Sequence, residues 1–247
     1  MEIVAALVAG GFIGAVLGFI GAGGAMLTVP ILMYIFAFTP HHATTASLAV
    51  VFLAATSGVA AKIRSKEVLY RDALAIWSIG LVTNLGFSSI SDRFPEKFIT
   101  TGFAVVLIAA GISSLRPSLS DTHKRMPLQK LILLALLIGA VTGIFGIGGG
   151  FLAIPALVLF FGTPQNIAAG TSMLIIALNS LTALLAHYRM WSQIDWHIPA
   201  VIGLAAVIVA NIASRAGSFA SPIIMRRTFA ALLFSVSLFT IAQTWIF

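Results

Sequence analysis

Eight apolar segments, each long enough to cross a lipid bilayer as a helix, dominate this sequence. A helix needs about 20 residues to span the roughly 30 Å hydrocarbon layer. The segments are Ile3–Ile20, Thr44–Ala61, Ala73–Ile90, Phe98–Leu115, Leu128–Phe145, Ile167–His187, Ile198–Ser214 and Met225–Trp245. Only 9% of the residues are charged, whereas a soluble domain carries about a quarter. The sequence therefore predicts an all-α polytopic protein embedded in a cell membrane.

Two shorter apolar stretches, Ala25–Phe38 and Phe151–Phe161, each follow a cluster of glycines and contain a proline. They are too short to cross a bilayer comfortably on their own. The longest polar stretch of the chain separates them and divides the protein in half. We therefore expect a membrane repeat over residues 1–116, a polar linker over 117–127 and a second repeat over 128–247.

The two halves resemble each other in sequence. The segment Gly14–Pro30 aligns without a gap with Gly139–Pro155, and more than half of the aligned residues are identical. The match continues to Ser47, which aligns with Ser172. Each half then holds four full spans and one short glycine-broken segment. An internal repeat in a membrane protein places the substrate path between the two copies.

The basic residues decide between parallel and inverted repeats. They flank the apolar segments, so the net charge of +7 predicts membrane orientation and not nucleic-acid binding. If both short stretches cross, eleven of the fourteen lysines and arginines share one side; if neither does, nine do. The positive-inside rule prefers the larger bias, which favours inverted repeats.

Glycine clusters interrupt two helices that would otherwise be continuous. The glycines concerned are Gly21, Gly23 and Gly24 in the first half, and Gly146, Gly148, Gly149 and Gly150 in the second. Glycine permits backbone conformations that end a helix, and such a break inside a membrane must face protein or a water-filled cavity. The half-helices that follow, from Ala25 and Phe151, would present free N–H groups that attract an anion. We predict an anion site near the middle of the bilayer.

Close helix packing is the alternative role for glycines in membrane helices. We favour packing for Gly14, Gly18, Gly139 and Gly143, which precede the breaks, and the anion site for the denser clusters that follow.

Hydroxyl and amide side chains follow the short stretches. Thr171 and Ser172, with Ser47 as their counterpart, could donate to a bound oxyanion, although capping or bonding to the preceding helical turn is routine for such residues. Asn179 lies two helical turns beyond Ser172 and could line the same cavity.

Other functional classes find little support in the sequence. Cysteine is absent, which excludes disulfides and thiolate metal sites. We identify no nucleophile paired with a base and no cluster of metal ligands, so we expect neither an enzyme nor a cofactor. All seven acidic residues lie at the ends of apolar segments or between them, whereas cation pathways usually carry embedded carboxylates.

The pattern Gly-x-x-x-Gly-x-x-Gly-x-Gly-Gly-Gly-x-x-x-x-Pro in Gly139–Pro155, with its near copy in Gly14–Pro30, resembles the TauE/SafE family of sulfite and organosulfur-anion exporters. The resemblance covers essentially the whole chain. It implies a multi-pass permease of the cell membrane that moves a small sulfur-containing anion, usually outward. Ala25 stands where the second half has Gly150, and Ala46 replaces the threonine of the Thr171–Ser172 pair. A membrane scaffold or insertion factor that uses the repeat only for packing is the alternative, and the oligomeric state stays open.

Overall fold

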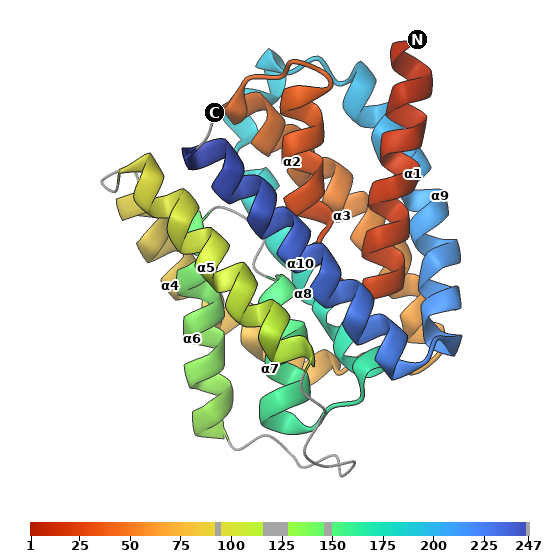
Figure 1. Cartoon of the computed structure of the whole chain (residues 1–247), viewed down its shortest axis with the longest axis vertical. Helices are drawn as coiled ribbons and strands as arrows, with labels where there is room; N and C mark the ends of the chain where they lie inside the picture. Colours follow the sequence, from red (N-terminus) through yellow and green to blue (C-terminus); the bar gives the residue numbers. More distant parts are fainter. Residues whose placement is uncertain (92–94, 116–127, 146–149, 246–247) are drawn as a thin grey trace.

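The computed structural model describes residues 1–91, 95–115, 128–145 and 150–245. Within these ranges the chain is helical and contains no strand (Figure 1). The helices are α1 (Glu2–Ile20), α2 (Gly24–Tyr34), α3 (Pro40–Arg64), α4 (Tyr70–Ser91), α5 (Glu96–Leu115), α6 (Leu128–Phe145), α7 (Gly150–Phe161), α8 (Gln165–Ala186), α9 (His197–Phe219) and α10 (Pro222–Trp245), with a 3-10 helix η1 (Tyr188–Gln193) before α9. Every predicted apolar stretch corresponds to one helix, so the all-α prediction is confirmed.

Five helices among the described residues are long and apolar enough to cross a membrane, namely α1, α3, α8, α9 and α10. Shorter apolar helical stretches occupy Thr100–Leu115 in α5 and Gln129–Val141 in α6. The chain is therefore a multi-pass membrane protein. The count of four full spans in each half stays a prediction.

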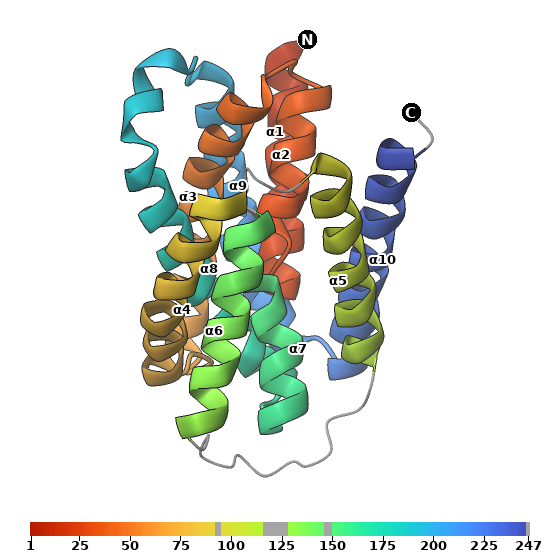
Figure 2. The same cartoon turned by 90° about the vertical axis from the view of Figure 1, so that its left-hand side faces the viewer.

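Successive helices run in alternate directions along the long axis of the molecule (Figures 1 and 2). Helices α1 and α9 run parallel, because Gly10, Gly14 and Gly18 meet residues of α9 in increasing order. Helix α3 also runs parallel to α9, because Ser57 contacts Val207 and Lys62 contacts Ser218 further along both helices. Since α1 and α3 run in the same direction, the short α2 between them returns toward the end at which α1 begins. Helix α6 begins at the opposite end from α1 (Figure 2).

Glycines allow α1 and α9 to touch through their backbones. A Cβ atom at Gly14 would lie 2.5 Å from the carbonyl oxygen of Ala206, and one at Gly18 would lie 2.9 Å from Ala210 Cα. Helices α4 and α6 meet in the same way, since a Cβ at Gly139 would collide with Gly80. The packing role predicted for these three preceding glycines is confirmed; the surroundings of Gly143 lie outside what the structure describes.

Helices α3 and α9 are joined by hydrogen bonds between polar groups inside the apolar interior. The Ser57 hydroxyl donates to the Val207 carbonyl at 2.8 Å, and the Asn211 amide donates to the Ser57 carbonyl at 3.2 Å. The Ser214 hydroxyl donates to the Gly58 carbonyl at 3.0 Å. An unpaired polar group in hydrocarbon costs several kcal/mol, so these bonds determine which faces of the two helices meet.

Turns of the same type end both short helices. The Phe38 N–H donates to the Leu32 carbonyl at 3.0 Å after α2, and the Thr163 N–H donates to the Leu157 carbonyl at 3.1 Å after α7. The residue before each donor is left-handed, Ala37 with φ 55° and Gly162 with φ 61°. A left-handed residue lets the chain reverse direction, so that the next N–H reaches a carbonyl that the end of the helix leaves without a donor.

Candidate anion site and a buried ion pair

The predicted break between α1 and α2 is present. Gly21 ends α1 with φ 85°, and Gly23 precedes α2 with φ 92°. Both are left-handed conformations that glycine adopts without the steric cost of a side chain. In the second half α6 ends at Phe145 and α7 begins at Gly150; Gly146, Gly148 and Gly149 lie outside the described residues.

The first break is enclosed by protein. Gly21 to Gly24 are buried, and a Cβ at Gly21 would lie 2.6 Å from Ala169 Cα in α8. A Cβ at Gly24 would meet Leu17 at 3.3 Å and Val51 of α3 at 3.5 Å. The first N–H groups of a helix have no acceptor within it, so the start of α2 brings such groups to its contact with α3, three residues after the contact of Gly21 with α8.

The predicted hydroxyl residues are all buried, and in this conformation two of them bond to their own helix. Thr171 Oγ1 donates to the Ile167 carbonyl at 2.7 Å, and Ser47 Oγ donates to the Thr44 carbonyl at 2.8 Å. Thr171 and Ser172 are fully buried two and three residues after Ala169, and Thr171 Oγ1 also accepts a hydrogen bond from the Leu69 N–H at 3.1 Å, so Thr171 lies against the connection between α3 and α4. The bonding to the preceding turn that we left open for Thr171 and Ser47 is therefore present.

Helix α8 carries further buried polar groups that the sequence analysis did not select. The Gln165 Nε2 and Ser180 Oγ atoms are buried without a hydrogen-bond partner in the described structure. Ser180 follows the predicted Asn179, which is 8% exposed. Buried polar atoms in native proteins are nearly always bonded to protein or water. Gln165 and Ser180 are therefore two buried polar positions on α8 whose role the sequence analysis did not anticipate.

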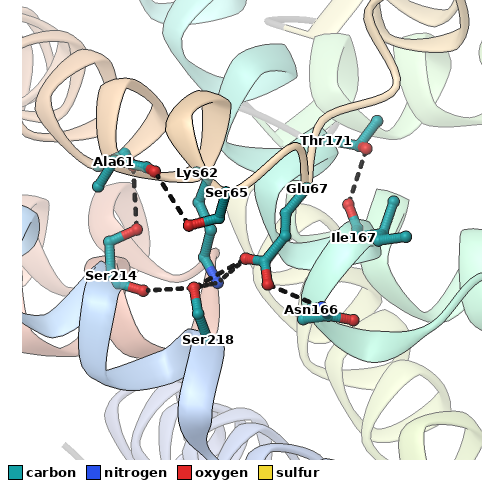
Figure 3. Close-up of polar contacts among 10 residues, drawn as sticks. Ala61, Lys62, Ser65, Glu67, Asn166, Ile167, Thr171, Ser214 and Ser218 are labelled. Atoms are coloured by element: carbon teal, nitrogen blue, oxygen red, sulfur yellow. Dashed lines mark hydrogen bonds and ion pairs between the residues drawn. The ribbon is translucent and has the colours of Figure 1, made fainter.

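A buried ion pair lies where α3, α8 and α9 meet (Figure 3). Lys62 Nζ lies 2.7 Å from Glu67 Oε2, and the two side chains are 0% and 10% exposed. The Ser218 hydroxyl donates to the same carboxylate oxygen at 2.8 Å. The Asn166 amide donates to the other oxygen, Oε1, at 2.8 Å. The Glu67 carboxylate thus accepts from an ammonium, a hydroxyl and an amide.

The helix end explains why Lys62 and Glu67 meet. The Lys66 N–H donates to the Ile63 carbonyl and the Glu67 N–H to the Lys62 carbonyl, both at 3.0 Å, while Lys66 is left-handed with φ 57°. These two bonds form the Schellman turn that commonly ends a helix. That turn usually brings together two apolar residues at the positions that Lys62 and Glu67 occupy. Here an ion pair replaces the apolar contact.

Burial and hydrogen bonding act in opposite directions on Glu67. Burial of the carboxyl group raises its pKa, but the hydrogen bonds from Lys62, Asn166 and Ser218, together with the charge of Lys62, lower the pKa below the ordinary 4.5. The carboxylate is therefore ionised at neutral pH.

The opposite end of the α3–α8 pair is built differently. There His187 Nδ1 lies 2.8 Å from Thr45 Oγ1. Burial, with a smaller effect of the charge on His41, lowers the pKa of His187 below 6.5, so this end holds a neutral imidazole at neutral pH. Lys62 and His187 occupy aligned positions in the two halves of the sequence. Lys62 forms an ion pair with Glu67, whereas His187 contacts the neutral hydroxyl of Thr45.

Sequence reasoning missed the functional potential of Lys62 and Glu67. Both lie at the end of an apolar segment, where charges are normally solvated. Lys62 was counted only toward membrane orientation, and Glu67 only among the acids that lie outside the apolar segments. A lysine followed five residues later by a glutamate, across a short connection between two apolar segments, was the available signal. This signal indicates a polar site only once Asn166 and Ser218 are known to donate to Glu67.

Comparison with known proteins gives the chain a family. A family model described as "Sulfite exporter TauE/SafE" matches residues 6–240. The chain belongs to the TauE/SafE family. The names of similar proteins agree with the TauE/SafE assignment, because these proteins are named probable membrane transporter proteins. One from Xylella fastidiosa strain 9a5c is 27% identical over 245 residues, 96% of this chain and 94% of its own. YunE from Bacillus subtilis is 28% identical over 235 residues, 84% of each chain.

A third relative, from Methanocaldococcus jannaschii, is 30% identical over 190 residues, 72% of this chain and 69% of its own. The resemblance stated from the glycine motifs is therefore confirmed. As a TauE/SafE protein with several apolar helices, the chain is a multi-pass membrane transporter, and its relatives' names indicate transport and not catalysis.

Proposed function

We propose that this TauE/SafE protein is a permease for a small sulfur-containing anion, such as sulfite or a sulfonate, and that it exports this anion across the cell membrane. The observation that carries the proposal is the glycine break at Gly21–Gly23. It places Gly21, at the end of α1, against Ala169 of α8, the helix that carries Thr171 and Ser172, and it starts α2 at Gly24. Free N–H groups and the positive end of a helix attract an anion without a basic side chain.

Two inverted repeats are part of the proposal. Several features support them: alternate helix directions, opposite starting ends of α1 and α6 (Figure 2), and matching turns after α2 and α7. Equivalent contacts also join α1 to α9 and α6 to α4. In this arrangement the second glycine cluster, Gly146 to Gly150, would form the other half of the anion site. This part of the proposal depends only on its sequence match with the first cluster.

Orientation follows from the basic residues. With alternating helices, eight of the ten lysines and arginines that the structure describes, Lys62 and Lys66 among them, belong to one end. We assign this end to the cytoplasm under the positive-inside rule. The family description supports export as the direction of transport.

Flux measurements in proteoliposomes test the proposed function. We expect liposomes that contain the purified protein to release entrapped sulfite faster than liposomes without protein. Combining Gly23→Val with Gly148→Val should abolish this release, because a branched side chain blocks both breaks. Gly86→Ala is the matched control, since a Cβ there meets nothing within 4 Å. Full flux through a correctly inserted double variant would remove the proposed site.

A further inference from the structure

The buried carboxylate of Glu67 occupies a site made of donors from three helices. Lys62 comes from α3, Asn166 from α8 and Ser218 from α9 (Figure 3). Lys62 Nζ also donates to Ser218 Oγ at 3.0 Å, which holds the ammonium and the hydroxyl together. An ammonium, a hydroxyl and an amide that converge on two oxygens form the donor set that proteins use for small oxyanions.

The occupant of this site belongs to a short connection and not to a helix. Glu67 lies between the end of α3 and the start of α4. Its carbonyl lies against Gly170 of α8, and a Cβ at Gly170 would also come 3.2 Å from Lys62 Cβ. The preceding Lys66 is left-handed without being glycine, a conformation that is unfavourable for a residue with a side chain. The connection thus holds Glu67 in place at an energetic cost.

Stability alone gives a weak reason for this pair. Replacing a buried ion pair with well-packed apolar residues is often neutral or stabilising, and the Schellman turn accommodates an apolar contact at these two positions. Ionisable residues buried within membrane helices commonly belong to substrate or ion pathways, and Lys62 is fully buried in the last turn of α3. The cluster also adjoins the candidate anion site, because Gly170 lies between Ala169, which contacts Gly21, and Thr171.

We propose that Lys62, Asn166 and Ser218 form a second binding site for a small oxyanion, which the Glu67 carboxylate occupies in this conformation and leaves when the connection between α3 and α4 moves. This inference deepens the proposed function, on which it depends for the identity of the anion. The transporter would then have a second anion-binding site at its basic end, and the carboxylate of Glu67 would block this site until it leaves.

Binding of sulfite to the purified full-length protein in detergent tests this site. Glu67→Ala removes the internal occupant, and we expect it to bind sulfite at least tenfold more tightly than the unmodified protein by calorimetry. Adding Lys62→Met to Glu67→Ala should weaken that binding at least tenfold, since it removes the charge that attracts the anion. Equal affinity in the unmodified protein and Glu67→Ala, or no effect of Lys62→Met, would overturn the proposal.

A second variant protects the test against misfolding. Glu67→Gln keeps the size of the side chain and removes its charge, and sulfite should raise its melting temperature more than that of the unmodified protein. Sulfate and acetate extend the titration to other oxyanions, and chloride provides the control. Chloride binding as tight as sulfite binding would contradict an oxyanion site, as would a Glu67→Gln protein that sulfite stabilises no more than the unmodified one.

The two proposals fail in different ways. Calorimetry measures binding and not flux, so absence of sulfite flux in liposomes would remove the proposed function and leave this site intact. Loss of Lys62-dependent oxyanion binding would remove this site and leave the glycine break as the transport site.

Discussion

Gly21, the residue at which α1 ends, lies directly against the backbone of Ala169 in α8. A Cβ at position 21 would come 2.6 Å from Ala169 Cα, closer than such atoms approach one another in proteins. The end of the first helix is therefore joined to the helix that carries Thr171 and Ser172, and the contact depends on glycine.

Gly21→Ala should impair transport. The new side chain would collide with Ala169, and alanine is strained at φ 85° because left-handed backbone crowds its Cβ. We expect sulfite flux in proteoliposomes to fall at least tenfold, together with a lower melting temperature. Gly11→Ala is the control, since its Cβ would lie 3.9 Å from Val209 in ordinary contact. Normal flux and stability of Gly21→Ala would show that the contact is dispensable.

Gly14→Val should destabilise the protein without touching the candidate site. Its side chain would push against Ala206, whose carbonyl oxygen lies 2.5 Å from the Cβ position. Overpacking of this kind costs about 1–3 kcal/mol. Thermal unfolding in detergent measures the effect, and the expected result is a clear fall in melting temperature. If Gly14→Val melts like the unmodified protein, the two helices are not in backbone contact.

Stability should decline in acid because of Glu67. Its pKa is lower in the folded protein than the ordinary 4.5, so the unfolded chain binds a proton more readily. The stabilisation is complete above the ordinary pKa and is lost as the pH falls through the lower, folded-state pKa. Melting temperatures between pH 7 and pH 3.5 test this, with Glu67→Gln as the comparison. An identical acid response in Glu67→Gln would assign the effect to other groups.

Lys66→Gly should stabilise the turn that holds Glu67. Glycine removes the cost of left-handed backbone, about 1–2 kcal/mol, and loses part of this through the greater freedom of the unfolded chain, about 0.5–1 kcal/mol. We expect a net gain of about 0.5–1 kcal/mol, seen as a higher melting temperature. Lys66→Ala separates the loss of charge from the change in backbone, because alanine keeps the strain. A gain of equal size in Lys66→Ala would contradict the explanation.

Local signals in the sequence were sufficient for much of the fold. Hydropathy located the ten α-helices that the structure describes, because a segment inside a membrane must be apolar over nearly its whole length whatever it packs against. The dense glycines at Gly21 and Gly23 marked the break, since two left-handed residues so close together favour glycine at both positions. Spacing of glycines by four residues, as in Gly14 and Gly18, indicated a packing face, although the partner helix could not be named.

Contacts between distant segments were beyond sequence reasoning. Nothing near Glu67 in the chain indicates that Asn166 and Ser218 donate to it, because these residues follow about 100 and 150 positions later. The unpaired Ser180 hydroxyl was equally hidden, since a serine within an apolar helix usually bonds to the preceding turn.

The close fit of α1 to α9 bears on how the protein is made. Most of the chain separates Gly10 from Ile202, the residue against which it rests, and synthesis delivers these helices in order. During insertion the glycine face of α1 must remain against lipid, or against a temporary companion, until the ninth helix leaves the ribosome. A chain truncated before α9 would therefore leave its first helix without a permanent neighbour, and cells would be expected to degrade it.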